Sequence, residues 1–374
     1  MKSRTGPARF ASSRRRRRPL HHPDQVGRCR RLASFRPIEF CRAGRHHRRP
    51  RAAPLQALPS DAFPRFLGVD MTLIVTVNGS ETTWMLADRR ISYVGRPPKD
   101  DARKLLSLET TDGVAILGYA GLGMTEGGTE PADWMSAVLR GRNLPLEQCL
   151  EALHAALVNQ FPEHLAGLPG KFEASHTILV AAFLKEAPKI YTLDLAVDRA
   201  TAVCKTRLAS YIGPKPAASL RPPRVMSAGS GSTHVHRDAK SFRTLLKLVR
   251  ECDRKRIDPV LVADYLAGMN QRVSASDKSV GARSIVMWRH RKQGAYGGGG
   301  SQQYYNGINR EIDSPVLPSI CNGMDSAAVI AAIWPLSMAF LEARMAGDGP
   351  SEIDADAMSA AVARVPTRPD ETLK

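Results

Sequence analysis

Two successive β-hairpin patterns, starting at Met71, constrain the fold of this chain most. The run TLIVTV is followed by Asn78-Gly79 and then by TTWMLA, and both runs are rich in β-branched and apolar residues. This pattern predicts two antiparallel strands joined by a tight turn. A second pair, ARKLLSLE and GVAILGYAG, is separated only by Thr111, Asp112 and Gly113. Paired hairpins at the start do not fit a simple parallel βαβ order.

The sequence after these hairpins alternates between helical and strand patterns. Apolar residues at three- and four-residue spacings predict four helices, at 131–142, 146–165, 238–251 and 259–271. Runs of β-branched and apolar residues predict further strands at 176–184, 189–195, 201–207 and 284–290. This order fits an α+β fold in which two β-sheets pack together and helices cover both outer faces.

The two ends of the chain differ from this central part. Residues 1–70 are dominated by Arg, Pro, Ala and His and show no apolar period, so this segment is not expected to fold alone. Four consecutive glycines near residue 297 predict a flexible loop. We therefore divide the chain into a disordered Arg/Pro-rich extension (1–70), a folded domain (71–291), a Gly-rich loop (292–301) and a C-terminal extension with one apolar helix and a polar tail (302–374).

The net charge of +18 comes mostly from the first segment. Residues 1–70 hold 18 Lys/Arg and 4 Asp/Glu, a net charge of +14, whereas residues 71–374 hold 36 and 32, a net charge of +4. A positive surface that attracts polyanions would need the excess on the folded part. The charge distribution therefore does not favour a nucleic-acid partner for the domain.

Cysteine spacing and apolar runs bear on metal, compartment and membrane. The six cysteines show none of the short paired spacings of zinc or redox sites, which indicates a reducing cytoplasm and no structural metal. The longest apolar run, Ala327 to Leu341, contains Pro335 and is shorter than the roughly 20 residues that a membrane-spanning helix needs. We expect a buried or interface helix there, and neither a membrane partner nor a cofactor.

Thr72 follows Met71 directly, and a threonine at a chain terminus can act as a catalyst by itself. Its hydroxyl is the nucleophile, and its own α-amine has a pKa near neutrality and can accept the proton. Such a site needs a nearby lysine held by a buried carboxylate, and a backbone N–H for the oxyanion. Asp88 lies 16 residues after Thr72, in LADRR, and Lys104 lies 32 residues after it, in DDARKL.

In this register, the sequence from Met71 to about Arg291 resembles the proteasome β-subunit family of N-terminal-nucleophile hydrolases and its bacterial proteasome-like peptidase branch. The resemblance implies a four-layer αββα sandwich with two antiparallel sheets between helical layers. It also implies catalytic roles for Thr72, Asp88 and Lys104. Without this register, Asp88 and Lys104 would be read as a structural ion pair, and Thr72 as an ordinary strand residue.

The resemblance extends to several other residues. It implies that the N–H of Gly118 meets the oxyanion and that Ser230, in AGSGS, lies near the nucleophile's amine. Asp277 matches an aspartate of a late loop, whereas Ser279 comes one residue early and matches less well. The backbones of Ser92 and Ala120 match positions that pair with an extended peptide. Four residues match substrate-pocket positions and imply an apolar preference: Ile91, Ala102, Ile116 and Met124.

These matches predict a threonine peptidase or amide hydrolase that is active only when Thr72 is N-terminal. Gly68-Val69-Asp70-Met71 lacks the glycine that self-cleaving precursors carry before the threonine. Translation from Met71, followed by loss of that methionine, would expose Thr72, so we hypothesise that 1–70 is a mispredicted extension. The alternative is an inactive proteasome-like scaffold whose basic N-terminal segment binds nucleic acid or a partner. The resemblance implies a homo-oligomer but names neither an ATPase partner nor a substrate.

Overall fold

The structure is a computed structural model of the 374-residue chain. It describes residues 72–93, 96–121, 129–166, 175–198, 203–211, 223–292, 298–310, 317–347 and 352–370. The extension predicted over 1–70 lies outside the described residues, as does Met71.

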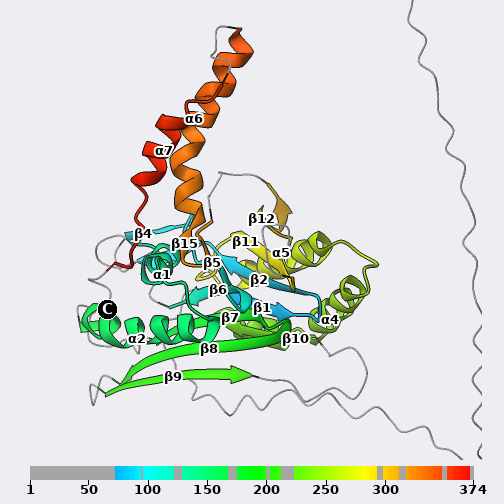
Figure 1. The fold of residues 1–374 in the computed structure, drawn as a ribbon. Helices are drawn as coiled ribbons and strands as arrows, with labels where there is room; N and C mark the ends of the chain where they lie inside the picture. The colour runs from blue at the N-terminus through cyan, green and yellow to red at the C-terminus, as the bar shows by residue number, and fades with distance from the viewer. Residues whose placement is uncertain are drawn as a thin grey trace, which may run out of the picture. The chain divides into compact units, whose positions relative to one another are not determined.

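The first sheet has six strands in the order β10-β1-β2-β11-β12-β13, all of them antiparallel to their neighbours (Figure 1). The strands are β1 (Ile74–Asn78), β2 (Thr82–Asp88), β10 (Arg224–Ala228), β11 (Arg283–His290), β12 (Gly299–Tyr305) and β13 (Ile308–Asn309). The predicted hairpin joins β1 and β2, and the N–H of Gly79 donates to the carbonyl of Thr82 at 2.9 Å in its turn.

The second sheet has seven strands in the order β15-β14-β5-β6-β7-β8-β9. They are β5 (Leu105–Thr110), β6 (Gly113–Ala120), β7 (Ser175–Leu184), β8 (Ala187–Asp198), β9 (Val203–Tyr211), β14 (Ser319–Cys321) and β15 (Met324–Asp325). The hairpin of β5 and β6 agrees with the sequence prediction, and β14 is parallel to β5. A separate two-stranded ribbon consists of β3 (Ile91–Tyr93) and β4 (Arg96–Lys99).

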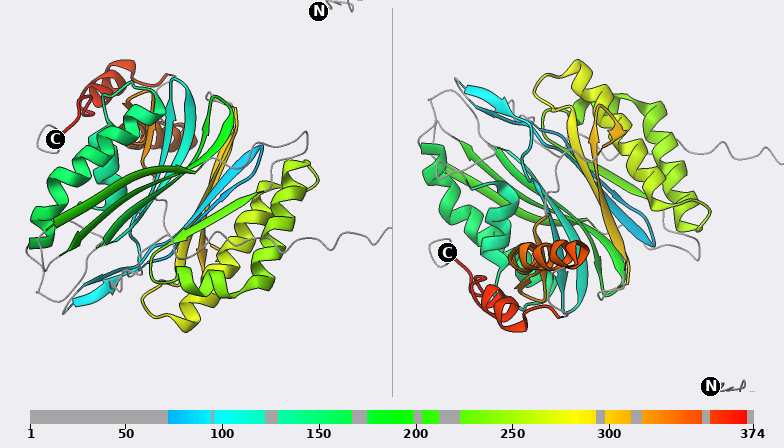
Figure 2. Two further views of the ribbon diagram at one scale, coloured as in Figure 1. Left: turned by 90° about the horizontal axis from the view of Figure 1, so that it is seen from below. Right: turned by 90° about the horizontal axis from the view of Figure 1, so that it is seen from above.

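The two sheets lie face to face, and helices cover both outer faces (Figure 2). One outer layer is α1 (Pro131–Leu139) and α2 (Leu146–Ala166), and the other is α3 (Ser232–Arg237), α4 (Ala239–Asp253) and α5 (Pro259–Ser276). Three buried apolar clusters separate the four layers: one under α1 and α2, one under α3 to α5, and one between the sheets. The predicted αββα sandwich is confirmed.

Local sequence explains where α4 and α5 begin. Asp258 caps α5 by accepting a hydrogen bond from the N–H of Val260 at 2.8 Å, and Pro259 takes the first helical position, where a missing N–H costs nothing. Asp238 caps α4 in the same way, accepting from the N–H of Ser241 at 3.0 Å. Both helices begin within one residue of the predicted position.

Three predictions about the C-terminal part need correction. Gly299 to Ser301, predicted as part of a flexible loop, begin strand β12, which pairs with β11. The tail holds a second helix, α7 (Ala355–Ala363), in addition to α6 (Ser326–Ala346). The first of these corrections has a physical reason. Residues 299–301 form a strand because their backbone pairs with β11, which is already fixed in the sheet, and this pairing outweighs the low strand propensity of glycine.

The third correction concerns α6 itself. The helix has 21 residues, so it is long and apolar enough to cross a membrane by length and composition, although the apolar run alone suggested otherwise. It is also not a buried helix, because Trp334 is 60% exposed and Ala327 is its only buried residue. The helix extends past the apolar run at both ends, since Asp325 caps its start and Gly347 ends it in a left-handed conformation.

Candidate active site

Thr72 lies two residues before β1, and Asp88 is the last residue of β2. The hairpin brings these two residues together, because Ile74 pairs with Ala87 and the N–H of Asp88 donates to the carbonyl of Leu73 at 3.0 Å. The Asp88 carboxylate accepts from the N–H of Leu73 at 2.7 Å and from Oγ1 of Thr72 at 2.5 Å. A spacing of 16 residues in the sequence thus becomes a direct contact.

Lys104 precedes β5 and completes this group from the second sheet. Its Nζ donates to Oγ1 of Thr72 at 2.5 Å and to Oδ1 of Asp88 at 3.0 Å, and its side chain is only 3% exposed. Burial lowers the pKa of Lys104 from its ordinary value, and the adjacent Asp88 carboxylate opposes this effect. The hydroxyl of Thr72 therefore accepts a hydrogen bond from a cation and donates one to a carboxylate.

The second carboxylate oxygen of Asp88 fixes the surrounding loops. Oδ2 accepts from the N–H of Arg90 and from the N–H of Gly281, each at 3.0 Å. Arg90 in turn binds Asp100, with Nε 2.6 Å from Oδ1, and donates to the carbonyl of Lys278 at 2.6 Å. Asp88 is fully buried, and its five donors compensate the cost of burying a carboxylate.

A chain of hydroxyl groups reaches Thr72 from the other side. Oγ of Ser230 lies 3.4 Å from the carbonyl of Thr72 and 2.7 Å from Oγ of Ser279. Ser279 donates from Oγ to Oδ1 of Asp277 at 2.5 Å and from its N–H to the same oxygen at 2.9 Å. Ser230 and Asp277 are therefore connected through Ser279, the residue that the sequence register matched less well. The spacing of aspartate and serine by two residues is typical of an Asx turn and could have indicated this contact.

Gly229 lets the chain after β10 approach the candidate nucleophile. Its φ is +88°, a conformation that favours glycine, and a Cβ at this position would lie 2.1 Å from the carbonyl oxygen of Thr72. The N–H of Gly231 donates to the same oxygen at 3.3 Å. This close approach positions Ser230 beside Thr72.

Gly118 lies within β6, paired with Leu105 on one side and with Leu179 on the other. The N–H of Tyr119 donates to the carbonyl of Lys104 at 3.1 Å, so by strand alternation the N–H of Gly118 points toward β7. The same alternation directs the N–H of Gly121, just after the strand, to the Lys104 side. Since β5 begins only at Leu105, no residue of β5 lies opposite Gly121.

The residues predicted to contact substrate lie in different surroundings. Ser92 is in β3, which pairs with β4 alone among the described strands, and Ala120 ends β6. Ile116 is fully buried in the cluster between the sheets, so its side chain offers no surface to a substrate. Ile91 and Ala102 are also buried, and Met124 lies outside the described residues. Within the described ranges, no three His, Cys, Asp or Glu residues are grouped as metal ligands.

Comparisons with known proteins give structural similarity alone. No protein-family model and no curated protein sequence matches the chain. Anbu from Hyphomicrobium sp. strain MC1 is 10% identical with a TM-score of 0.37, and the match covers 76% of this chain and 100% of that one. Anbu (ancestral beta-subunit) from Yersinia bercovieri is 14% identical with a TM-score of 0.36, covering 73% and 97%.

Eukaryotic HslV from Trypanosoma brucei is 19% identical with a TM-score of 0.29, and the match covers 58% of this chain and 98% of that one. The chain is similar in structure, at low sequence identity, to Anbu and HslV, which are proteasome β-type N-terminal-nucleophile hydrolases.

Proposed function

We propose that this chain is a threonine-type hydrolase that cleaves peptide or other amide bonds, with Thr72 as its nucleophile once Thr72 is N-terminal. The observation that carries the proposal is the position of Oγ1 of Thr72, 2.5 Å from both Nζ of Lys104 and Oδ1 of Asp88. A buried cation at this distance stabilises negative charge on the hydroxyl oxygen as it attacks. A buried Lys–Asp pair with only a structural role would not need a hydroxyl between its members.

In the proposed reaction, Oγ1 of Thr72 bonds to the substrate's carbonyl carbon while its proton passes to the α-amine of the same residue. The tetrahedral intermediate collapses when the C–N bond breaks and the α-amine returns the proton to the leaving nitrogen. Water then attacks the ester, with the α-amine again as base, and releases Thr72 and the carboxylic acid. Ser230, Ser279 and Asp277 would hold the α-amine in place through their hydrogen-bonded chain.

The proposal assigns the oxyanion donor to the N–H of Gly121 in place of that of Gly118. Gly118 is paired within the sheet on both sides, and a Cβ there would lie 2.4 Å from Sδ of Met85 in the core between the sheets. Gly121 follows the end of β6 on the side of Lys104, next to Ala120, whose backbone we expect to pair with the substrate. The second substrate-pairing segment would be β3 at Ser92, which among the described strands pairs with β4 alone.

The test compares two forms of the protein, the full chain and a chain that begins at Thr72. We expect a peptide epoxyketone, which bonds to both the hydroxyl and the free α-amine of an N-terminal threonine, to label only the second form. Peptide mapping by mass spectrometry should locate the adduct on Thr72, and Thr72→Ala should abolish it. A folded chain beginning at Thr72 that takes no label would contradict the proposal and support the inactive-scaffold alternative.

The proposed mechanism predicts a bell-shaped dependence of kcat/KM on pH. The α-amine must be neutral, so activity should rise with pH through its pKa, which is about 7.7–8.0 for an unperturbed amine and lower beside a cation. Lys104 must stay protonated, and burial lowers its pKa from the ordinary 10.5. Activity should therefore fall again as the pH rises further, and this fall should begin before pH 10.5 is reached. Initial rates on a fluorogenic peptide would measure both limbs. Activity that is still rising at pH 10.5 would show that the charge on Lys104 is not needed.

The inactive-scaffold alternative relies on a segment outside the described residues, and no contact among the described ones favours it. A homo-oligomer remains our expectation from the resemblance, together with peptide or protein substrates and a cytoplasmic location. Mass measurement of the natural protein would decide whether residues 1–70 are present. If they are, Thr72 has no free amine and the reaction has no base.

A further inference from the structure

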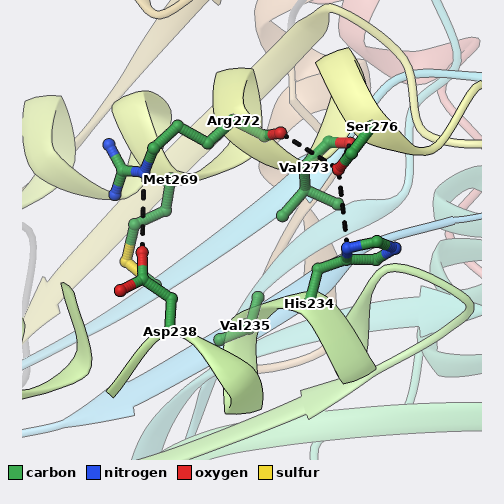
Figure 3. A pocket seen from close by; sticks show the side chains of 7 residues that line it. All are labelled: His234, Val235, Asp238, Met269, Arg272, Val273 and Ser276. Carbon is green, nitrogen blue, oxygen red and sulfur yellow. Dashed lines mark hydrogen bonds and ion pairs between the residues drawn. The ribbon is translucent and has the colours of Figure 1, made fainter. Parts of the chain in front are cut away.

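Charged side chains outside the candidate active site differ in how deeply they are buried. In the groove between α3 and α5, Figure 3 shows Asp238 facing Arg272 across 3.8 Å, and their side chains are 42% and 49% exposed. Water screens a pair this exposed, so it contributes little to fixing the backbone around it. Glu130 is the opposite case, because its side chain is only 9% exposed and it binds the main chain directly before Lys104.

Lys99 and Arg103 surround the carboxylate of Glu130 with donors. The carboxylate accepts from Nζ of Lys99 at 2.6 Å, and from the N–H and Nε of Arg103 at 2.7 Å and 3.2 Å. Burial raises the pKa of Glu130, but the hydrogen bonds from Lys99 and Arg103 outweigh burial and hold the pKa below its ordinary value. Glu130 is therefore ionised at neutral pH, and its bond to the N–H of Arg103 is charge-assisted.

Arg103 and the start of α1 exchange hydrogen bonds in both directions. The N–H of Arg103 donates to Glu130, and the carbonyl of Arg103 accepts from the N–H of Ala132 at 3.1 Å. Glu130 is the N-cap residue of α1, and its side chain forms no cap hydrogen bond with the helix. An N-cap side chain ordinarily accepts from the N–H groups of its own helix, so this carboxylate binds Arg103 in place of its helix. Both polar groups of the Arg103 main chain are thereby fixed on α1.

Lys104 follows Arg103, so the bonds to α1 lie one residue away from the cation of the candidate site. The carbonyl of Lys104 accepts from the N–H of Tyr119 at 3.1 Å, and β5 begins only at Leu105. The main chain at Lys104 is therefore placed by β6 on one side and by α1 on the other. Nζ of Lys104 must stay close to Oγ1 of Thr72, 2.5 Å away, because a displacement of about 1 Å at a catalytic group can lower the rate about 10²-fold.

We propose that Glu130 is a positioning residue for Lys104. Its bond to the N–H of Arg103 fixes the main chain from which Nζ of Lys104 reaches the candidate nucleophile. The inference rests on the proposed function, in which this cation stabilises negative charge on the attacking oxygen. Lys99 is not needed for this role, because its side chain is 37% exposed and its loss would leave both bonds from Arg103 to Glu130 in place.

The experiment is a double-mutant cycle in the chain that begins at Thr72. Glu130→Met keeps the approximate volume of the side chain but leaves no acceptor for the N–H of Arg103. It is expected to lower kcat on a fluorogenic peptide about 10²-fold and to leave KM unchanged. In a Lys104→Met background the same substitution should cause no further loss, because the group that it displaces is already absent. A purely structural role would lower kcat by the same factor in both backgrounds.

Two further variants separate the hydrogen bond from the charge and from general stability. Glu130→Gln keeps an acceptor oxygen for the N–H of Arg103, so it should recover most of the kcat that Glu130→Met loses. Glu109→Met is the matched control, because Glu109 is also buried, pairs with Arg289 at 2.7 Å and lies near the other end of β5. It should lower the urea midpoint of unfolding and leave kcat unchanged.

The position of Nζ can also be followed without any reaction at Thr72. Acetic anhydride modifies accessible amines, and the side chain of Lys104 is only 3% exposed. Mass spectrometry of the full chain should show slow acetylation of Lys104, faster acetylation in Glu130→Met, and no change in Glu109→Met.

Failure of this inference and failure of the proposed function give different results. If the unsubstituted chain that begins at Thr72 takes no epoxyketone label, the proposed function is wrong and this inference with it. If that chain is labelled, wild-type kcat in Glu130→Met, or an equal further loss in the Lys104→Met background, would overturn the inference alone. The same conclusion would follow if Lys99→Met or Glu130→Gln lost as much kcat as Glu130→Met, or if acetylation of Lys104 were unchanged in Glu130→Met.

Discussion

Replacing Lys104 with methionine is expected to lower kcat/KM of a chain that begins at Thr72 by about 10³-fold or more. Methionine keeps most of the side-chain volume but removes the cation that donates to Oγ1 of Thr72. The attacking oxygen would then face Asp88, 2.5 Å away, with no positive charge to compensate it. Initial rates on a fluorogenic peptide, together with the rate of epoxyketone labelling, would measure the loss.

This substitution also affects folding, so stability must be measured beside activity. Removing one member of a buried ion pair costs about 3 kcal/mol. The carboxylate of Asp88 would keep its other donors, three backbone N–H groups and Oγ1 of Thr72, so we expect a folded but less stable protein. Urea denaturation would establish this.

Lys99→Met is the matched control, because Lys99 lies five residues earlier, pairs with Glu130 at 2.6 Å and is 37% exposed. It should cost about 1 kcal/mol or less and leave kcat/KM unchanged. Equal losses of activity in Lys99→Met and Lys104→Met would mean that activity depends on the conformation of residues 99–104 and not on the cation at Thr72.

The elements that the sequence predicted well are those with local signals. The β1–β2 hairpin carries Asn78-Gly79 between two apolar runs, and α5 carries its aspartate cap and first-turn proline, so both could be located from neighbouring residues alone. The contact of Thr72, Asp88 and Lys104 could be predicted because antiparallel hairpins convert fixed spacings into fixed positions. Asp88 needs only the β1–β2 register, and Lys104 needs the second sheet to stack on the first.

The features that the sequence did not predict depend on distant parts of the chain. Strand β10 has no alternating pattern, and it forms because β1 offers an open edge. Ser279 acquires its place from Asp277 and Ser230, the latter 49 residues away in the sequence. The sequence left open whether α6 is buried or exposed as an interface helix, because an apolar helix covered by its own chain and one that contacts a partner have the same composition.

Gly229→Ala is expected to disrupt the site through the backbone alone. Alanine at a φ of +88° is strained, and its Cβ would lie 2.1 Å from the carbonyl oxygen of Thr72, 2.7 Å from Cγ2 and 2.8 Å from the carbonyl carbon. Because two of these contacts are with main-chain atoms, either Thr72 or the turn before α3 must move. We expect a loss of about 2 kcal/mol or more in the free energy of unfolding and near-complete loss of epoxyketone labelling.

Gly268→Ala makes the same chemical change where the structure permits it. Gly268 lies inside α5, and an added Cβ there would meet only Nη1 of Arg272, at 3.7 Å. Alanine should therefore stabilise the helix by up to about 1 kcal/mol and leave labelling intact. The contrast isolates the close approach at Thr72 from any general effect of replacing a glycine. If Gly229→Ala were labelled at the wild-type rate, Thr72 would not need the position that the turn gives it, and the hydroxyl chain through Ser230 would have no part in the reaction.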